Sequence, residues 1–161
     1  MGILTNAIKM EIDGEKYYRN LAEMNKDNHL HGVFQKLADD EKDHAHVLKQ
    51  KEEHQECTLK KSQTFQKASS VFQSLEEFKS EIKEIPSQID SYRFALEKEQ
   101  ESIDLYTDLK EKAESGGDKE IYDFLIEQEK DHYNTINSLI DFLTKSEDWV
   151  ESAEFGVREK Y

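Results

Sequence analysis

Four glutamates and two histidines recur along the chain in a pattern that could bind metal ions. The segment Glu41 to His44, with the sequence Glu-Lys-Asp-His, returns unchanged as Glu129 to His132, and the pattern Glu-x-x-His occurs at these two places only. Glu11 and Glu99 are separated by the same 88 residues. Carboxylate and imidazole groups are ligands of divalent metals, and an oxygen-rich set of this kind suits iron or manganese better than zinc.

The spacing of these residues predicts that they lie on the inward faces of helices. Residues three apart share a helical face, so each Glu-x-x-His presents both of its side chains in one direction. Glu11 shares its face with Ala7, Gly14 and Tyr18. The corresponding neighbours of Glu99 are Ala95, Ser102 and Tyr106.

Carboxylates buried together need cations among them, because an unpaired buried charge is costly and like charges repel. A lone glutamate on an apolar stripe is usually a boundary residue, and a lone Glu-x-x-His usually lies on the surface. Six such residues repeated at one offset instead predict a site for two metal ions. The alternative is a duplicated bundle that no longer binds metal. The predicted ligands are Glu11, Glu41, His44, Glu99, Glu129 and His132.

Helical periodicity places these residues on four long helices. The expected ranges are Leu4 to Asn25, Leu30 to Glu53, Ile89 to Glu114 and Lys119 to Lys145. We expect an all-α, ferritin-like four-helix bundle built from two duplicated helical hairpins, with a long crossover between helices two and three. Gly116 and Gly117 indicate the end of the third helix, and Asp118 is the expected cap of the fourth.

The bundle domain is expected to span residues 1–145, with the crossover at about 54–88. Within the crossover we predict one short helix from Leu75 to Glu84, capped by Ser74 and stopped by Pro86. The tail, residues 146–161, contains Trp149 and Phe155 and is expected to pack on the bundle or on a partner subunit.

Composition limits the partners and the compartment. The 161 residues carry a net charge of −14, which disfavours nucleic acid and anionic membrane surfaces. Cys57 is the only cysteine, so neither an internal disulfide nor a cysteine-bound iron centre is expected. We find no signal peptide and expect a cytoplasmic protein.

Several residues near the predicted site have two interpretations. Tyr18 and Tyr106 are either core aromatics or hydroxyl donors that hold the carboxylate ligands. Gly14 and Ser102 are small and would leave room for an exogenous ligand beside the metals. The remaining histidines, which have no partner in the repeat, are expected on the surface: His29, His31, His46 and His54.

The paired Ala-x-x-x-Glu and Glu-Lys-Asp-His segments resemble the rubrerythrin group of the ferritin-like superfamily. The resemblance implies two iron ions, with manganese as the other candidate metal. It implies that Glu41 and Glu129 bridge the two ions. Glu11 and His44 would complete the ligands of one ion, and Glu99 and His132 those of the other. Tyr18 and Tyr106 match tyrosines that support the ligands in the family. The chain lacks the rubredoxin cysteines of the family, and Ser102 stands where the family has an extra glutamate that helps the site change ligands. This second difference weakens the case for peroxide reduction.

The resemblance favours an oxidoreductase that reduces hydrogen peroxide or dioxygen with electrons from an external redox protein, in a chain expected to form a homodimer. One alternative is iron oxidation and storage of the ferritin type, which needs a many-subunit shell. The other is a non-catalytic helical interaction protein.

Overall fold

The computed structural model describes residues 2–75 and 88–159, and the side chains of Leu75 and of residues 146–159 lie outside this description. Its described elements are the helices α1 (Ile3–Met24), α2 (Leu30–Glu52), α3 (Thr64–Leu75), α5 (Ile89–Lys112) and α6 (Gly116–Glu159). No strand occurs in the described ranges. The predicted all-α, ferritin-like architecture is therefore confirmed.

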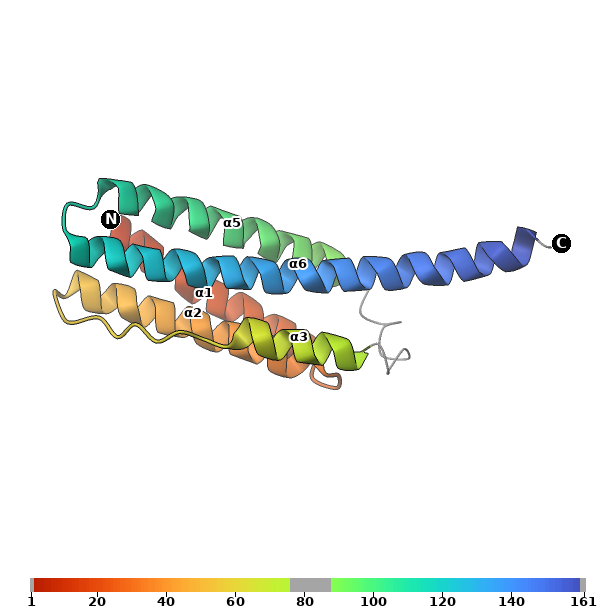
Figure 1. Ribbon diagram of the computed structural model, residues 1–161. Coiled ribbons are helices and arrows are strands. Elements are labelled where there is room, and N and C mark those ends of the chain that lie inside the picture. Colours follow the sequence, from red (N-terminus) through yellow and green to blue (C-terminus); the bar gives the residue numbers. More distant parts are fainter. Residues whose placement is uncertain (1, 76–87, 160–161) are drawn as a thin grey trace.

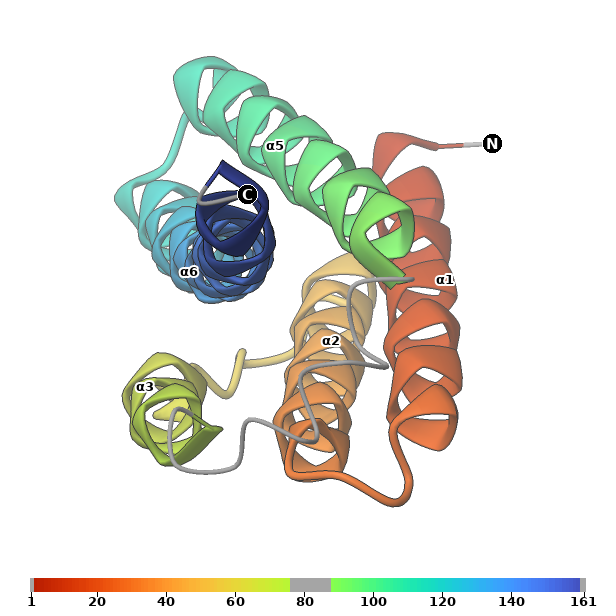
Figure 2. The same cartoon turned by 90° about the vertical axis from the view of Figure 1, so that its right-hand side faces the viewer.

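The four long helices form two hairpins that pack against each other. Helix α1 lies beside α2 and α5 lies beside α6, while α3 covers α2 and α6 from outside (Figures 1 and 2). The chain passes between the hairpins through a long crossover that carries α3. This is the expected connection between the second and third bundle helices.

Local capping explains where two of the helices begin and end. Ser115 precedes α6, and its Oγ accepts a hydrogen bond from the Asp118 backbone N–H at 3.1 Å, so the cap is Ser115 and not the expected Asp118. At the end of α2, His54 adopts a left-handed backbone with φ 58°. The Gln55 N–H then donates to the Gln50 carbonyl at 2.8 Å, which stops the helix.

The crossover carries a helix, α3, that the sequence pattern did not predict. Helix α3 occupies Thr64–Leu75, whereas the sequence pattern places a helix after Ser74. Ser74 lies inside α3 and donates to the Ser70 carbonyl at 3.2 Å, so it does not cap a following helix. Most of the predicted helix Leu75 to Glu84 lies outside the described residues.

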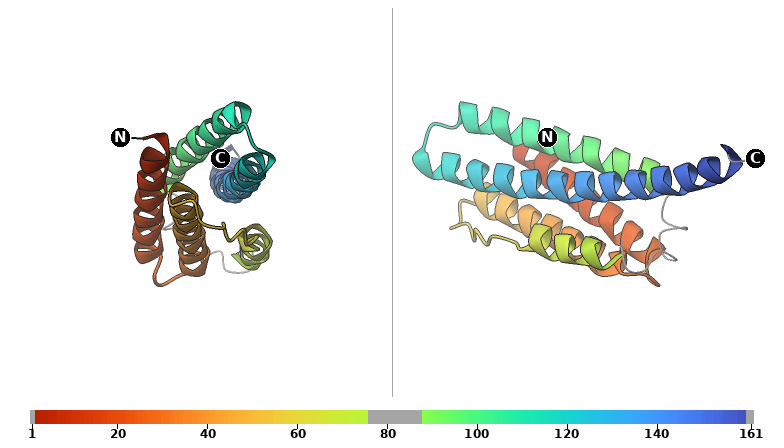
Figure 3. Two further views of the ribbon diagram at one scale, coloured as in Figure 1. Left: turned by 90° about the vertical axis from the view of Figure 1, so that its left-hand side faces the viewer. Right: turned by 45° about the vertical axis from the view of Figure 1, so that its right-hand side comes forward.

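The fourth long helix is longer than expected. The sequence pattern predicts an end near Lys145, but α6 continues to Glu159 and projects beyond the other helices (Figure 3). The packing of the tail side chains on the bundle or a partner remains a prediction.

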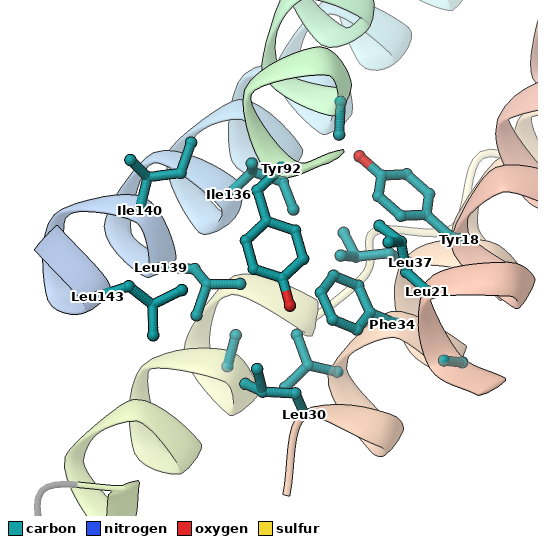
Figure 4. Close-up of a cluster of buried hydrophobic side chains, with 14 of the residues drawn as sticks. Tyr18, Leu21, Leu30, Phe34, Leu37, Tyr92, Ile136, Leu139, Ile140 and Leu143 are labelled. Atoms are coloured by element: carbon teal, nitrogen blue, oxygen red, sulfur yellow. The ribbon is translucent and has the colours of Figure 1, made fainter. Parts of the chain in front are cut away.

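Two apolar clusters fill the bundle, one at each end. The larger cluster gathers side chains from all four long helices and α3, with Phe34 stacked on Tyr92 at a ring distance of 5.5 Å (Figure 4). The smaller cluster includes Ala7, Leu48 and Leu125. On each long helix the predicted ligands lie between the residues of these two clusters, so they occupy the middle of the bundle.

No helix among the described residues is both long enough and apolar enough to pass through a membrane.

Candidate metal centre

All six predicted ligand side chains are buried in one cluster. Each long helix contributes to it: α1 provides Glu11, α5 provides Glu99, and α2 and α6 each provide a Glu-x-x-His pair. Their exposed fractions range from 0% to 4%. The helical period explains this burial, because each ligand lies on the same stripe as the apolar residues one turn away.

The ligands fall into two overlapping groups, each of which could hold one metal ion. Within each group, one ligand atom per residue lies within 4.8 Å of every other. The first group is Glu11, Glu41, His44 and Glu129, and the second is Glu41, Glu99, Glu129 and His132. Glu41 and Glu129 belong to both groups.

The histidines link the two hairpins. His44 Nδ1 lies 2.9 Å from Glu129 Oε1, and His132 Nδ1 lies 2.8 Å from Glu41 Oε1. The same nitrogens approach the carboxylate of their own hairpin more loosely, at 3.6 Å from Glu11 and from Glu99 respectively. Each histidine therefore directs Nδ1 toward the carboxylates of both halves.

The two tyrosines also cross between the hairpins. The Tyr18 hydroxyl donates to Glu99 Oε1 at 2.6 Å, and the Tyr106 hydroxyl donates to Glu11 Oε1 at 2.5 Å. Burial, reinforced by the neighbouring carboxylates, raises the pKa of both tyrosines well above the usual value, so the hydroxyls keep their protons. The structure thus places both tyrosines against ligand carboxylates, each on the hairpin opposite its own.

Burial and mutual repulsion raise the pKa of two of the carboxyls. For Glu41 and Glu129 the main cause is burial, and the negative charge of Glu11 and its neighbours adds to it. Both pKa values lie well above 4.5. Without a cation, these two groups favour the protonated form.

The other two carboxyls favour the charged form. Burial alone would raise the pKa of Glu11, but hydrogen bonding to Glu41 and contact with His44 outweigh it and lower the pKa to about 2. The pKa of Glu99 is lowered against burial by hydrogen bonding to Glu129 and by His132. Without metal, the cluster therefore contains two carboxyls that favour the charged form, Glu11 and Glu99, and two that favour the protonated form, Glu41 and Glu129.

Three buried carboxylate oxygens accept no hydrogen bond from an N–H group or a hydroxyl of the described residues: Glu11 Oε2, Glu99 Oε2 and Glu129 Oε2. Buried polar atoms are nearly always paired, and an unpaired one costs about 1–3 kcal/mol. Three of them in one cluster, beside two imidazole nitrogens, match the donor set of a hard or borderline divalent metal. The residues present therefore fit a bound metal pair.

The sequence did not predict a role for Asp40, whose carboxylate contacts the ring nitrogen of His132 that faces away from the other ligands. Asp40 Oδ2 lies 2.9 Å from His132 Nε2 and accepts hydrogen bonds from Ser62 Oγ at 2.8 Å and Thr64 Oγ1 at 2.6 Å. Burial opposes the charge on Asp40, but these contacts, led by His132, keep its pKa below the usual value. The sequence offers one indication of this role, which is that Asp40 immediately precedes the ligand Glu41. The repeat does not reproduce it, because the residue 88 positions further on is Gln128.

The remaining histidines lie outside the cluster. His29, His46 and His54 are exposed, as predicted. His31 is half-buried, and its Nδ1 lies 2.7 Å from the Ala22 carbonyl oxygen at the α1–α2 turn. Cys57 is partly exposed.

Comparison with known proteins identifies one relationship. The family model described as Rubrerythrin matches residues 2–140 of the chain, a range that contains every residue of the cluster. Comparison with curated proteins gave no significant match, and comparison with solved structures gave none.

Proposed function

Because the chain belongs to the rubrerythrin family, as its paired motifs predicted, we propose that the buried cluster binds two iron ions and that the loaded protein reduces hydrogen peroxide or dioxygen. The observation that carries this proposal is the group of three buried carboxylate oxygens without partners. They provide lone pairs that no N–H or hydroxyl donor of the described residues occupies.

The overlap of the two ligand groups supports a specific assignment. Glu41 and Glu129, which belong to both groups, would bridge the two ions. Glu11 and His44 would complete one set of ligands, and Glu99 and His132 the other. Manganese is the alternative metal, because the same oxygen-rich ligands accept it.

Bound iron would supply two electrons, one from each ferrous ion, to the oxidant. The protein provides the surroundings for that transfer. The apolar clusters exclude water from the two ends of the site, which strengthens the electrostatic interactions of the buried carboxylates. Tyr18 and Tyr106 fix one oxygen each of Glu99 and Glu11, so the other oxygen is free to bind.

Asp40 orients His132 for binding. A histidine that donates one ring N–H to a carboxylate is held in one tautomer with its other nitrogen available to a metal. Asp40 at Nε2 leaves Nδ1 of His132 facing the cluster. Electrons would come from a separate redox protein, since the chain has no cysteine pair to hold a second iron centre.

Anaerobic titration with ferrous iron tests the proposal. We expect two ions per chain, followed by oxidation of the di-ferrous protein by hydrogen peroxide or dioxygen in a stopped-flow experiment. Glu99→Gln should lose at least one ion, whereas Glu97→Gln, on an exposed position of the same helix, should bind like the original protein. Binding of fewer than two ions, or no oxidation by either oxidant, would contradict the proposal.

A further inference from the structure

A cavity reaches the carboxylate cluster from one side of the bundle, between α1 and α5. Its volume is about 450 Å³, and its inner end is formed by Glu41 and Glu99 together with Gly14 and Ser102. Neither histidine ligand lines it. The cavity therefore reaches the cluster at its carboxylates and not at its histidines.

The cavity is much larger than a small inorganic oxidant requires. A water molecule occupies about 30 Å³ in the liquid, so the cavity of about 450 Å³ has room for the volume of about fifteen. Cavities that hold organic ligands span about 300–1,000 Å³. Its size is that of a site for an organic molecule.

The outer part of the cavity has an apolar wall and a balanced charge. Phe94 and Tyr17 lie with ring centroids 5.4 Å apart, and Met10 also lines the cavity, with its Sδ 3.5 Å from the Ser102 hydroxyl. Phe94 is 46% exposed, which is unusual for a large apolar side chain of the described residues. Apart from the cluster residues Glu41 and Glu99 at the inner end, the charged lining residues balance, two lysines against two acidic residues: Lys9, Lys98, Asp13 and Glu101. In a chain of net charge −14, this entrance suits an uncharged ligand with an apolar body.

Gly14 lets the cavity reach the carboxylates. A Cβ at this position would lie 3.0 Å from Glu41 Oε2, so any side chain here would press on that oxygen. At the matching position in the repeat, the Ser102 hydroxyl turns back to donate to the Lys98 carbonyl at 3.1 Å. Both positions leave the inner end open for a reactive group.

We propose that the α1–α5 cavity binds an uncharged organic hydroperoxide, with its apolar body against Phe94, Tyr17 and Met10 and its peroxide group beside Glu41 and Glu99. This inference rests on the proposed function, which supplies the electrons. The O–O bond breaks with uptake of two electrons and two protons, and the products are an alcohol and water. The two electrons come from the two ferrous ions, which become ferric.

The test compares cumene hydroperoxide with hydrogen peroxide as oxidants of the di-ferrous protein. We expect saturation with cumene hydroperoxide. Phe94→Ala should raise its half-saturation concentration about tenfold, the effect of losing an aromatic contact of about 1.4 kcal/mol, and leave the rate with hydrogen peroxide within about twofold. Met24→Ala is the matched control, since Met24 is an exposed apolar residue of α1 outside the cavity.

Binding of 2-phenyl-2-propanol, the alcohol product, gives a readout that is independent of turnover. Its NMR titration of the protein should shift resonances of Met10, Tyr17 and Phe94, and Met10→Trp, which fills the cavity, should abolish these shifts. If hydrogen peroxide oxidises the protein while cumene hydroperoxide does not, or if the alcohol causes no shifts at the cavity, the inference fails and the proposed function stands. If neither peroxide nor dioxygen oxidises the protein, the proposed function itself fails.

Discussion

Glu129→Gln should separate metal binding from folding. Glu129 belongs to both ligand groups, and its Oε2 is one of the unpaired buried oxygens. Glutamine has nearly the same shape, and its amide oxygen can still accept from His44. Because burial and the charges of Glu11, Glu41 and Glu99 raise the pKa of Glu129 well above its usual value, the metal-free protein already favours a neutral group here.

We therefore expect the free energy of unfolding of the metal-free protein to change by less than about 1 kcal/mol, the net contribution of one hydrogen bond. Metal should behave differently. At a free metal concentration one hundred times the dissociation constant, binding stabilises the folded state by about 2.7 kcal/mol. For a chain of this size that raises Tm by about 5–11 °C. The original protein should show this rise and Glu129→Gln should show little of it.

Differential scanning calorimetry with chelator and then with manganese, which is stable in air, measures both effects. Glu127→Gln is the control, because Glu127 is exposed on the same helix and the charge change is identical. It should keep the full rise in Tm. The reasoning is refuted if Glu129→Gln gains as much from metal as the original protein, or if the original protein gains nothing.

The contacts around the cluster give further predictions. Asp40→Asn should weaken metal affinity about 10–100-fold by removing the carboxylate behind His132, whereas Asp43→Asn, at an exposed position, should leave titration calorimetry unchanged. The metal-free protein should lose stability as pH rises above about 4.5. The pKa values of Glu41 and Glu129 are raised in the folded state, so the folded protein holds protons that the unfolded chain releases. Chemical unfolding at several pH values measures this loss, and a rise in stability over that range would contradict the prediction. Phe34→Ala should cost about 3–5 kcal/mol in urea unfolding, since its side chain is fully buried between aromatic rings.

The sequence was sufficient to predict the bundle and the clustering of the six side chains. The repeat determines which glutamates and histidines correspond, and the helical period determines the face on which each lies. The repeat and the helical period can both be read from the order of residues, so neither depends on how the helices pack. They are the reason that Glu11 and Glu99 can be paired from the sequence alone.

Contacts between helices could not be predicted in the same way. Periodicity places Tyr18 on the face of Glu11, yet its hydroxyl reaches Glu99, because the partner depends on how the two hairpins are packed. Asp40 was missed for the same reason: its partners lie on α6 and at the start of α3. Helix α3 was not predicted, because its short apolar stripe becomes a helix only when Ala68 and Phe72 are buried against the bundle.

The crossed hydrogen bonds of the tyrosines have a consequence for how such a chain could arise. One hairpin alone holds three of the six ligands, and the acceptor of its tyrosine belongs to the other half. A half-length ancestor could complete this centre only by pairing with a copy of itself, at a rate set by its own concentration. Joining the copies through the crossover makes the encounter intramolecular, with an effective concentration on the order of millimolar. Joining the copies also frees each half to change its sequence separately. Two positions of the repeat already differ in this way, Asp40 from Gln128 and Gly14 from Ser102, and two identical subunits could never acquire such a difference.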